Sequence, residues 1–96
     1  MSLETAHERA GTRYASLKGW TDFKLSFPGK RGAPDRLYAH PQHGVVFVEW
    51  KRPGKEPTAQ QEIRHTEMRD AGLRVEWFDC VEKFIAWIDT FDDTGL

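Results

Sequence analysis

The stretch Val45–Lys51, with the sequence VVFVEWK, is the strongest strand signal in the chain and decides the class of fold. It opens with an uninterrupted run of β-branched and aromatic side chains, which is typical of a central strand covered on both faces. The run continues through Glu49 and Lys51 and breaks at the turn residues Arg52-Pro53-Gly54. We therefore expect a sheet whose middle strand ends in a carboxylate and an ammonium group on one face.

The segments around this strand predict an α/β domain with the order helix, three strands, helix, strand, helix. The expected helices cover residues 3–18, 58–71 and 80–88, and the expected strands cover residues 23–27, 35–39, 45–51 and 73–78. We expect Thr58 and Asp79 to cap the second and third helices. Short connections predict three antiparallel strands, and the helix before the fourth strand predicts a parallel crossover. A tail from about Thr90 is expected to fray.

Composition places the chain among single, small globular domains, which we assign to residues 1–96. Hydrophobic residues make up 39% and charged residues 30% of the 96 residues, which argues against disorder. No apolar run is long enough for a membrane-spanning helix, and the N-terminal residues do not resemble a secretory signal. Cys80 is the single cysteine, so an intrachain disulfide is excluded, and we expect a reducing, cytosolic compartment.

Charge is distributed unevenly along the chain. Residues 1–75 carry a net charge of +4, whereas residues 76–96 carry −5. Seven basic residues lie between positions 24 and 55, where the interior acids are Asp35 and Glu49. A basic middle segment suits a phosphate-bearing partner, although a solvated face of mixed charge is the plainer alternative.

Asp35, Glu49 and Lys51 form the constellation that points to chemistry. Asp35 begins one strand and Glu49 ends its hairpin partner, with 13 residues between them, so the hairpin brings the carboxylates to one edge of the sheet. Two carboxylates that close repel each other, and a hard cation such as Mg²⁺ or Mn²⁺ removes the conflict. Together with Lys51, the group suits metal-assisted hydrolysis of a phosphodiester.

Each part of this constellation also has an ordinary structural explanation. A Glu-X-Lys pattern on a strand is usually a surface ion pair. An aspartate that follows Pro34 is usually part of a turn. The conjunction of both acids and Lys51 with the cationic loop Pro28–Pro34 favours an enzyme.

The chain resembles the PD-(D/E)XK nucleases in the segments Gly32–Asp35 and Val46–Lys51 and in the later Gln61. It is similar to their virus-type replication-repair nuclease (VRR-NUC) branch in three further segments, which are residues 27–32, 51–54 and the helix that ends at 68–72. The resemblance extends from about Glu8 to Ile88. It implies a restriction-endonuclease-like mixed β-sheet, in the order α-β-β-β-α-β-α, flanked by helices.

The resemblance also implies a role for each matching residue. Asp35 and Glu49 would bind the metal, with the main-chain carbonyl of Trp50 as a further ligand. Lys51 would be the catalytic lysine. Gln61 would be an accessory glutamine that supports Lys51 or the scissile phosphate.

An acidic residue on the first helix usually completes such a site. Glu8 is the choice for this further catalytic residue and metal ligand, and Glu4 lies one turn earlier. The patterns Thr58–Gln61 and Thr5–Glu8 are also capping boxes, so Gln61 and Glu8 could serve helix starts as well.

Several other polar residues have weaker signals. The candidates for phosphate contacts on DNA are Lys30, Arg31, Arg36, Arg52 and Lys55. His40 and His43 flank Pro41 and are expected to be exposed turn residues rather than metal ligands. His65 lies four residues after Gln61 on the same helix face, where a phosphate contact is possible and an ordinary surface histidine is favoured.

The leading functional hypothesis is a Mg²⁺- or Mn²⁺-dependent, structure-selective DNA endonuclease. Similarity to stand-alone members of the branch implies a phage or prophage origin and a homodimer that resolves four-way (Holliday) junctions, acting in the cytoplasm of a bacterium or a phage-infected host. A flap or nicking nuclease within a replication-repair complex is the alternative among enzymes. A catalytically silent nucleic-acid-binding subunit and an interaction domain that binds no nucleic acid are the other classes.

Overall fold

The computed structural model describes residues 2–93, and its element order is the predicted one. The elements are α1 (Leu3–Leu17), β1 (Thr21–Lys24), β2 (Arg36–His40), β3 (Gly44–Trp50), α2 (Ala59–Asp70), β4 (Val75–Phe78), α3 (Val81–Asp89) and the short 3₁₀ helix η1 (Thr90–Asp93). In the described residues, no helix is long and apolar enough to cross a membrane.

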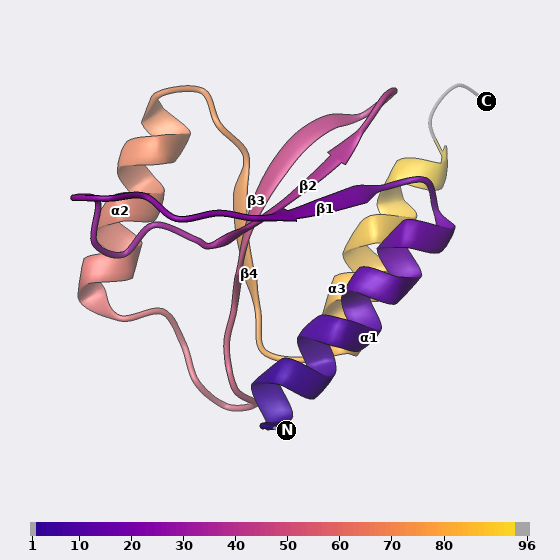
Figure 1. Ribbon diagram of the computed structural model, residues 1–96, viewed down its shortest axis with the longest axis horizontal. Coiled ribbons are helices and arrows are strands. Elements are labelled where there is room, and N and C mark those ends of the chain that lie inside the picture. Colours follow the sequence, from indigo (N-terminus) through magenta and orange to yellow (C-terminus); the bar gives the residue numbers. More distant parts are fainter. Residues whose placement is uncertain (1, 94–96) are drawn as a thin grey trace.

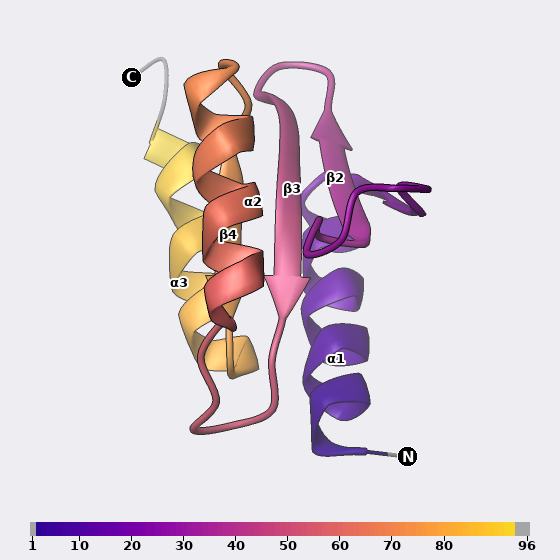
Figure 2. The ribbon, with the colours of Figure 1, turned by 90° about the vertical axis from the view of Figure 1, so that its left-hand side faces the viewer.

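The four strands form one mixed sheet in the order β1-β2-β3-β4. The pairs β1–β2 and β2–β3 are antiparallel, and the pair β3–β4 is parallel, as predicted. Helices α1 and α3 pack side by side on one face of the sheet, and α2 lies on the other (Figure 1). Seen from the α2 side, this helix covers the β4 half of the sheet and leaves β2 without a covering helix (Figure 2).

The core lies between the sheet and the α1–α3 pair. It contains the alternate β3 residues Val46, Val48 and Trp50, with Phe84 and Ile88 from α3, all of them buried. Each such side chain contributes about 1.5–3 kcal/mol when fully buried. The amphipathic spacing of α3 and the alternation of β3 therefore meet in one layer.

Gly11 allows α1 to approach this layer closely. A Cβ atom at Gly11 would lie 2.7 Å from Cη2 of Trp50 and 3.0 Å from Cδ2 of Phe84. The glycine that weakens the helix by propensity is thus required by the packing of two large rings.

The predicted first strand was wrong in its bounds, because β1 occupies Thr21–Lys24 instead of 23–27. β1 pairs with β2 only as far as the pair Lys24–Arg36, beyond which the partner strand turns at Pro34. A single further hydrogen bond, from Leu25 N to Asp35 O at 2.8 Å, continues the pairing. The alternation of 23–27 therefore reflects half-buried loop residues as much as a strand.

The helix starts differ from prediction in two places. Ser2 caps α1 by accepting a hydrogen bond from Thr5 N, so the expected capping box at Thr5–Glu8 does not exist. Cys80 is the N-cap of α3, and Asp79 is not its cap. Instead His7 Nδ1 of α1 accepts a hydrogen bond of 2.8 Å from Val81 N, which satisfies a free N–H group at the start of α3.

The C-terminal segment was expected to fray from about Thr90, and for residues 90–93 this expectation was wrong. These residues form η1, in which Phe91 packs edge-on against Trp20 and Trp87. Asp92 also forms an ion pair of 2.7 Å with Lys18 at the end of α1. Residues 94–96 of the predicted tail lie outside the described residues.

Candidate active site

Glu49 and Lys51 lie on the face of the sheet that α2 covers. Successive side chains on a strand alternate between faces, and Val48 and Trp50 point into the core on the α1–α3 side. Glu49 and Lys51 must therefore point to the opposite face. There Lys51 Nζ donates a hydrogen bond of 2.9 Å to Oε1 of Gln61 in the first turn of α2.

Gln61 joins the start of α2 to this lysine. Its Oε1 atom also accepts a hydrogen bond from Thr58 N, while Thr58 Oγ1 accepts from Gln61 N, so the predicted capping box is present. The capping role and the contact with Lys51 are both made by one oxygen atom. The helix start therefore fixes the amide that holds the Lys51 ammonium group.

Asp35 immediately precedes β2 and lies opposite Glu49. The antiparallel register pairs Arg36 with Val48, and one further step pairs Asp35 with Glu49. Directly opposed residues have Cβ atoms about 4.5–5.5 Å apart on the same face. The Asp35 carboxylate is 55% exposed, and Lys24 Nζ lies 3.7 Å from it.

The loop before Asp35 packs against the start of α2. Gly32 has a φ of +84°, and a Cβ atom there would lie 2.8 Å from the main-chain oxygen of Gln60. Arg64 Nε of α2 donates a hydrogen bond of 3.0 Å to the carbonyl oxygen of Arg31. Glycine is required here both for the left-handed backbone and for the close approach, which together set the position of Asp35 relative to Gln61.

His65 also belongs to this face, and the expectation of a surface histidine was wrong. The residue is 1% exposed, and its Nε2 atom has no hydrogen-bond partner among the described residues. The Oε1 atom of Glu49 lies 3.9 Å from this nitrogen. The spacing of four residues from Gln61 indicated the correct face of the helix, but sequence could not show the depth of burial.

Glu8 lies on the other side of the sheet from Asp35 and Glu49. Its carboxylate forms an ion pair with Arg36, whose Nε and Nη2 atoms both donate to Glu8 Oε2. Arg36 Nη1 donates a further hydrogen bond of 2.8 Å to Asp22, a residue that sequence reasoning missed. Burial alone would lower the pKa of Arg36, but the hydrogen bond and charge of Glu8 outweigh it and raise that pKa.

The structure does not bring Glu8 to the two predicted metal ligands. In the described residues, no three His, Cys, Asp or Glu side chains form a group that could hold a metal ion. Glu4, the alternative to Glu8, therefore belongs to no such group either. The role of Glu8 or Glu4 as a ligand stays a prediction.

The remaining oxygen donors fit a hard divalent cation. They are the carboxylates of Asp35 and Glu49 and the main-chain carbonyl of Trp50, which follows Glu49 directly. Mg²⁺ is typically held by one or two carboxylates and keeps several waters, so this small donor set suits it. Two basic side chains accompany the carboxylates. Lys24 on β1 lies near Asp35, and Lys51 follows Glu49 by two residues.

The predicted phosphate contacts differ in accessibility. Lys30, Arg31, Arg52 and Lys55 are all exposed. The first two lie in the loop against α2, and the other two follow β3, so both pairs flank the ends of the strands that carry Asp35 and Glu49. Arg36 is instead largely buried between two carboxylates, where it has no free N–H fork for a phosphate.

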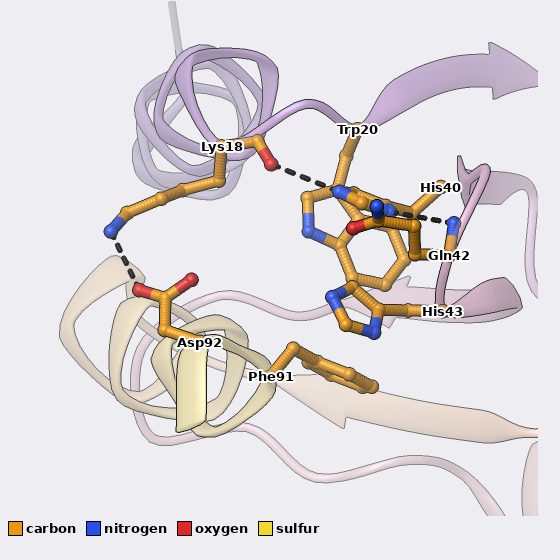
Figure 3. Close-up of a pocket in the computed structure, with 7 residues that line it drawn as sticks. All are labelled: Lys18, Trp20, His40, Gln42, His43, Phe91 and Asp92. Atoms are coloured by element: carbon orange, nitrogen blue, oxygen red, sulfur yellow. Dashed lines mark hydrogen bonds and ion pairs between the residues drawn. The ribbon is translucent and has the colours of Figure 1, made fainter. Parts of the chain in front are cut away.

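A hollow lies at the end of the β2–β3 hairpin that is farther from Asp35 and Glu49 (Figure 3). His40 and His43 line it and are half-buried, so the expectation that they are exposed was wrong. His43 stacks on Trp20, and His40 packs against the same ring at a tilt. Both nitrogens of His40 are used, by Gln42 N and by the carbonyl oxygen of Lys18. Lys18 is itself paired with Asp92 (Figure 3). The His40 ring and the Lys18 and Asp92 side chains of this hollow therefore already have partners.

Comparisons with known proteins place the fold. No family model matches the chain. The chain is 42% identical over 57 residues to a protein named "Putative nuclease p44" from Acyrthosiphon pisum secondary endosymbiont phage 1. The match covers 59% of this chain and 61% of that protein, so the chain spans about six tenths of that relative.

A solved structure named "VRR_NUC domain" matches the whole chain. It superposes with a TM-score of 0.79 and 24% sequence identity, and the match covers 100% of both chains. This likeness confirms the predicted element order and mixed sheet. The chain therefore has the α/β fold of the VRR_NUC domain.

Proposed function

We propose that this chain is a nuclease that hydrolyses DNA phosphodiester bonds with Mg²⁺ or Mn²⁺. The observation that carries the proposal is the hydrogen bond between Lys51 Nζ and Gln61 Oε1, on the face where Glu49 lies and Asp35 opposes it. The fold of the VRR_NUC domain and the similarity to a phage protein named as a nuclease support the same activity.

The side chains divide the work in a simple way. Asp35, Glu49 and the Trp50 carbonyl would hold the cation, which supplies charge stabilisation for the phosphate oxygens when bound. Lys51 Nζ, held by Gln61, is placed to orient the attacking water by a hydrogen bond and to balance negative charge that develops on the phosphate. Exposed cations at Lys30, Arg31, Arg52 and Lys55 would position the DNA backbone without reading its sequence.

Glu8 is proposed as a further ligand only in a rearranged site. Its carboxylate would first have to leave Arg36, because the guanidinium now occupies Oε2. The Mn²⁺ affinity of Glu8→Gln, measured from the signal of free Mn²⁺ in electron paramagnetic resonance, tests this point. Unchanged affinity would leave Glu8 with its ion pair alone.

The preferred substrate is proposed to be a four-way junction cut by a homodimer in the cytoplasm of a bacterial or phage-infected cell. An apolar surface supports the second copy. Phe23 and Val45 are 51% and 44% exposed and lie on the part of the α2 face that α2 leaves uncovered. A second copy that packed on this face would cover both side chains.

A cleavage experiment tests the function and the substrate together. Labelled four-way junction, 5′ flap, linear duplex and single-stranded DNA are incubated with Mg²⁺, with Mn²⁺ and with EDTA. Paired symmetric cuts in the junction, lost in EDTA and in Lys51→Ala and Asp35→Asn, are expected. Cutting of the flap alone would keep the nuclease and overturn the junction preference.

Two further outcomes would contradict the nuclease itself. Salt-sensitive binding without cleavage would favour a silent nucleic-acid-binding subunit. No binding and no cleavage would remove nucleic acid as the partner. Sedimentation velocity of the wild type and of Phe23→Ser tests the dimer separately, and a monomer at the concentrations used for cleavage would contradict it.

A further inference from the structure

His65 is the buried polar residue whose chemistry the structure leaves unused. The residue is 1% exposed, and Nε2 has no hydrogen-bond partner among the described residues. Leaving a buried polar atom unpaired costs about 1–3 kcal/mol. A phenyl ring of similar size would fill the same space without that cost, so packing alone does not explain a histidine.

The imidazole is directed at one specific carboxylate. Nε2 lies 3.9 Å from Oε1 of Glu49, which is about 1 Å beyond hydrogen-bond distance. The Glu49 side chain is itself largely buried, with 14% exposure. A small rotation of either side chain would close the contact.

Helix α2 and strand β3 are matched in spacing at this point. Residues two apart on a strand are separated by about 6.5–7 Å, and residues four apart on a helix rise by about 6 Å. Gln61 contacts Lys51, and His65 faces Glu49. One face of α2 therefore presents one polar group to each of the two functional residues of β3.

We propose that His65 is a positioning residue for Glu49. With a cation held at the site, Nε2–H of His65 would donate to Oε1 of Glu49 and fix the carboxylate that would hold the cation. Carboxylates that bind metals are commonly held by such hydrogen bonds. This inference rests on the proposed function, since it assigns a supporting group to the same site.

The test compares two substitutions that separate the hydrogen bond from the packing. His65→Phe keeps the bulk and removes the donor, whereas His65→Gln keeps an N–H group near the position of Nε2. Met68→Leu is the matched control, because Met68 is also buried on α2 and lacks a strong hydrogen-bonding group. The readouts are the Mn²⁺ dissociation constant, from free Mn²⁺ in electron paramagnetic resonance, and the urea midpoint of unfolding.

We expect His65→Phe to weaken Mn²⁺ binding by about 10–100-fold, the usual cost of losing a group that orients a metal ligand. Its unfolding midpoint is expected to equal or exceed that of the wild type, because an unpaired buried nitrogen is removed. His65→Gln should recover most of the affinity, and Met68→Leu should bind Mn²⁺ as the wild type does.

Equal Mn²⁺ affinity in His65→Phe and the wild type would overturn the proposal, as would an equal loss in His65→Phe and His65→Gln. If His65→Phe does not fold, His65→Leu takes its place as the variant without a donor, and a Mn²⁺ affinity of His65→Leu equal to that of His65→Gln contradicts the proposal. A wild type that binds and cuts while His65→Phe behaves identically refutes this inference alone. A wild type that neither binds Mn²⁺ nor cuts DNA refutes the proposed function with it.

Discussion

The two faces of the sheet treat their polar groups in opposite ways. On the α1–α3 face the buried Tyr38 hydroxyl bonds with Thr12 at 2.8 Å and accepts a hydrogen bond from Trp50 Nε1 at 3.1 Å. Burial raises the pKa of Tyr38, which keeps this hydroxyl neutral in the core. Every polar atom in this small network has a partner inside the protein.

The α2 face is built from charged and incompletely paired groups. His65 has a buried nitrogen without a partner among the described residues, Glu49 is mostly withdrawn from water, and Lys51 is held by a single amide. The helix above them buries only His65 and Met68 and exposes 66% of Ile63. One face therefore supplies stability, while the other carries the side chains that we propose to bind a cation.

The largest effect is expected from the α1–α3 face. Phe84 is fully buried and contacts the rings of Tyr38, Trp50 and Phe78. Phe84→Ala should lower the free energy of unfolding by about 3–5 kcal/mol, through lost burial and the cavity left behind. Urea unfolding measures this, and a cost as small as that of Ile63→Ala on the exposed side of α2 would contradict the comparison.

The ion pair of Glu8 with Arg36 should come next. Both side chains are largely buried, so Arg36→Met leaves the Glu8 carboxylate without its partner and should cost about 1–3 kcal/mol, less than for a fully buried pair. The double variant Arg36→Met, Glu8→Gln should recover part of that loss. Independent, additive effects of the two substitutions in a double-mutant cycle would refute the pairing.

Gly32→Ala tests how the α2 face is assembled. A methyl group here meets the main chain of Gln60 and Gln61 and must adopt a φ of +84°, so we expect a cost of about 1–3 kcal/mol. Because the loop carries Asp35, the rate of DNA cleavage should fall by roughly tenfold or more, as expected for a displaced ligand. Gly29→Ala is the control, since a Cβ atom at Gly29 would meet nothing within 4 Å and only the backbone strain is shared. Equal cleavage rates in the two alanine variants would contradict the role of the close approach.

The smallest effect concerns the junction between the loop after β3 and helix α3. Hydrogen bonds from Lys83 and from Gly54 N lower the pKa of Asp79 below its usual value. A lowered carboxyl pKa stabilises the fold above about pH 4, and that stability is lost as the pH falls through the pKa of the folded state. Asp79→Ala should therefore lower Tm by about 3–5 °C at pH 7 and by less at pH 3. A difference in Tm that does not shrink at pH 3 would contradict this.

Much of the fold could be predicted because local patterns and the sheet agree. The β-branched run of β3 and the stripe on α3 identified the core, and Thr58 with Gln61 identified the start of α2. The ends of β1 and the cap of α3 could not be predicted, because they depend on partners distant in sequence. Asp79 accepts a hydrogen bond from Gly54 N, and His7 of α1 instead accepts the one from Val81 N at the start of α3.

The candidate site also contains residues that the sequence could place and residues that it could not. Asp35, Glu49 and Lys51 follow from strand alternation and hairpin register, whereas the role of Gln61 was implied by the family resemblance; the structure has all four on one face. Glu8 could not be placed from sequence, because its position along α1 does not show that it meets Arg36 on the α1–α3 face of the sheet. The burial of His65 depends on how α2 tilts over β3 and β4, which no local pattern records.

The most direct test of the account measures DNA cleavage and unfolding in the same two lysine variants. Lys51→Ala removes the ammonium group of the α2 face, and Lys83→Ala removes one from α3, where it is paired with Asp79. We expect Lys51→Ala to lower the Mg²⁺-dependent cleavage rate by at least about 100-fold with little change in stability, and Lys83→Ala to cleave as the wild type does. Equal cleavage rates in the two variants would contradict the account.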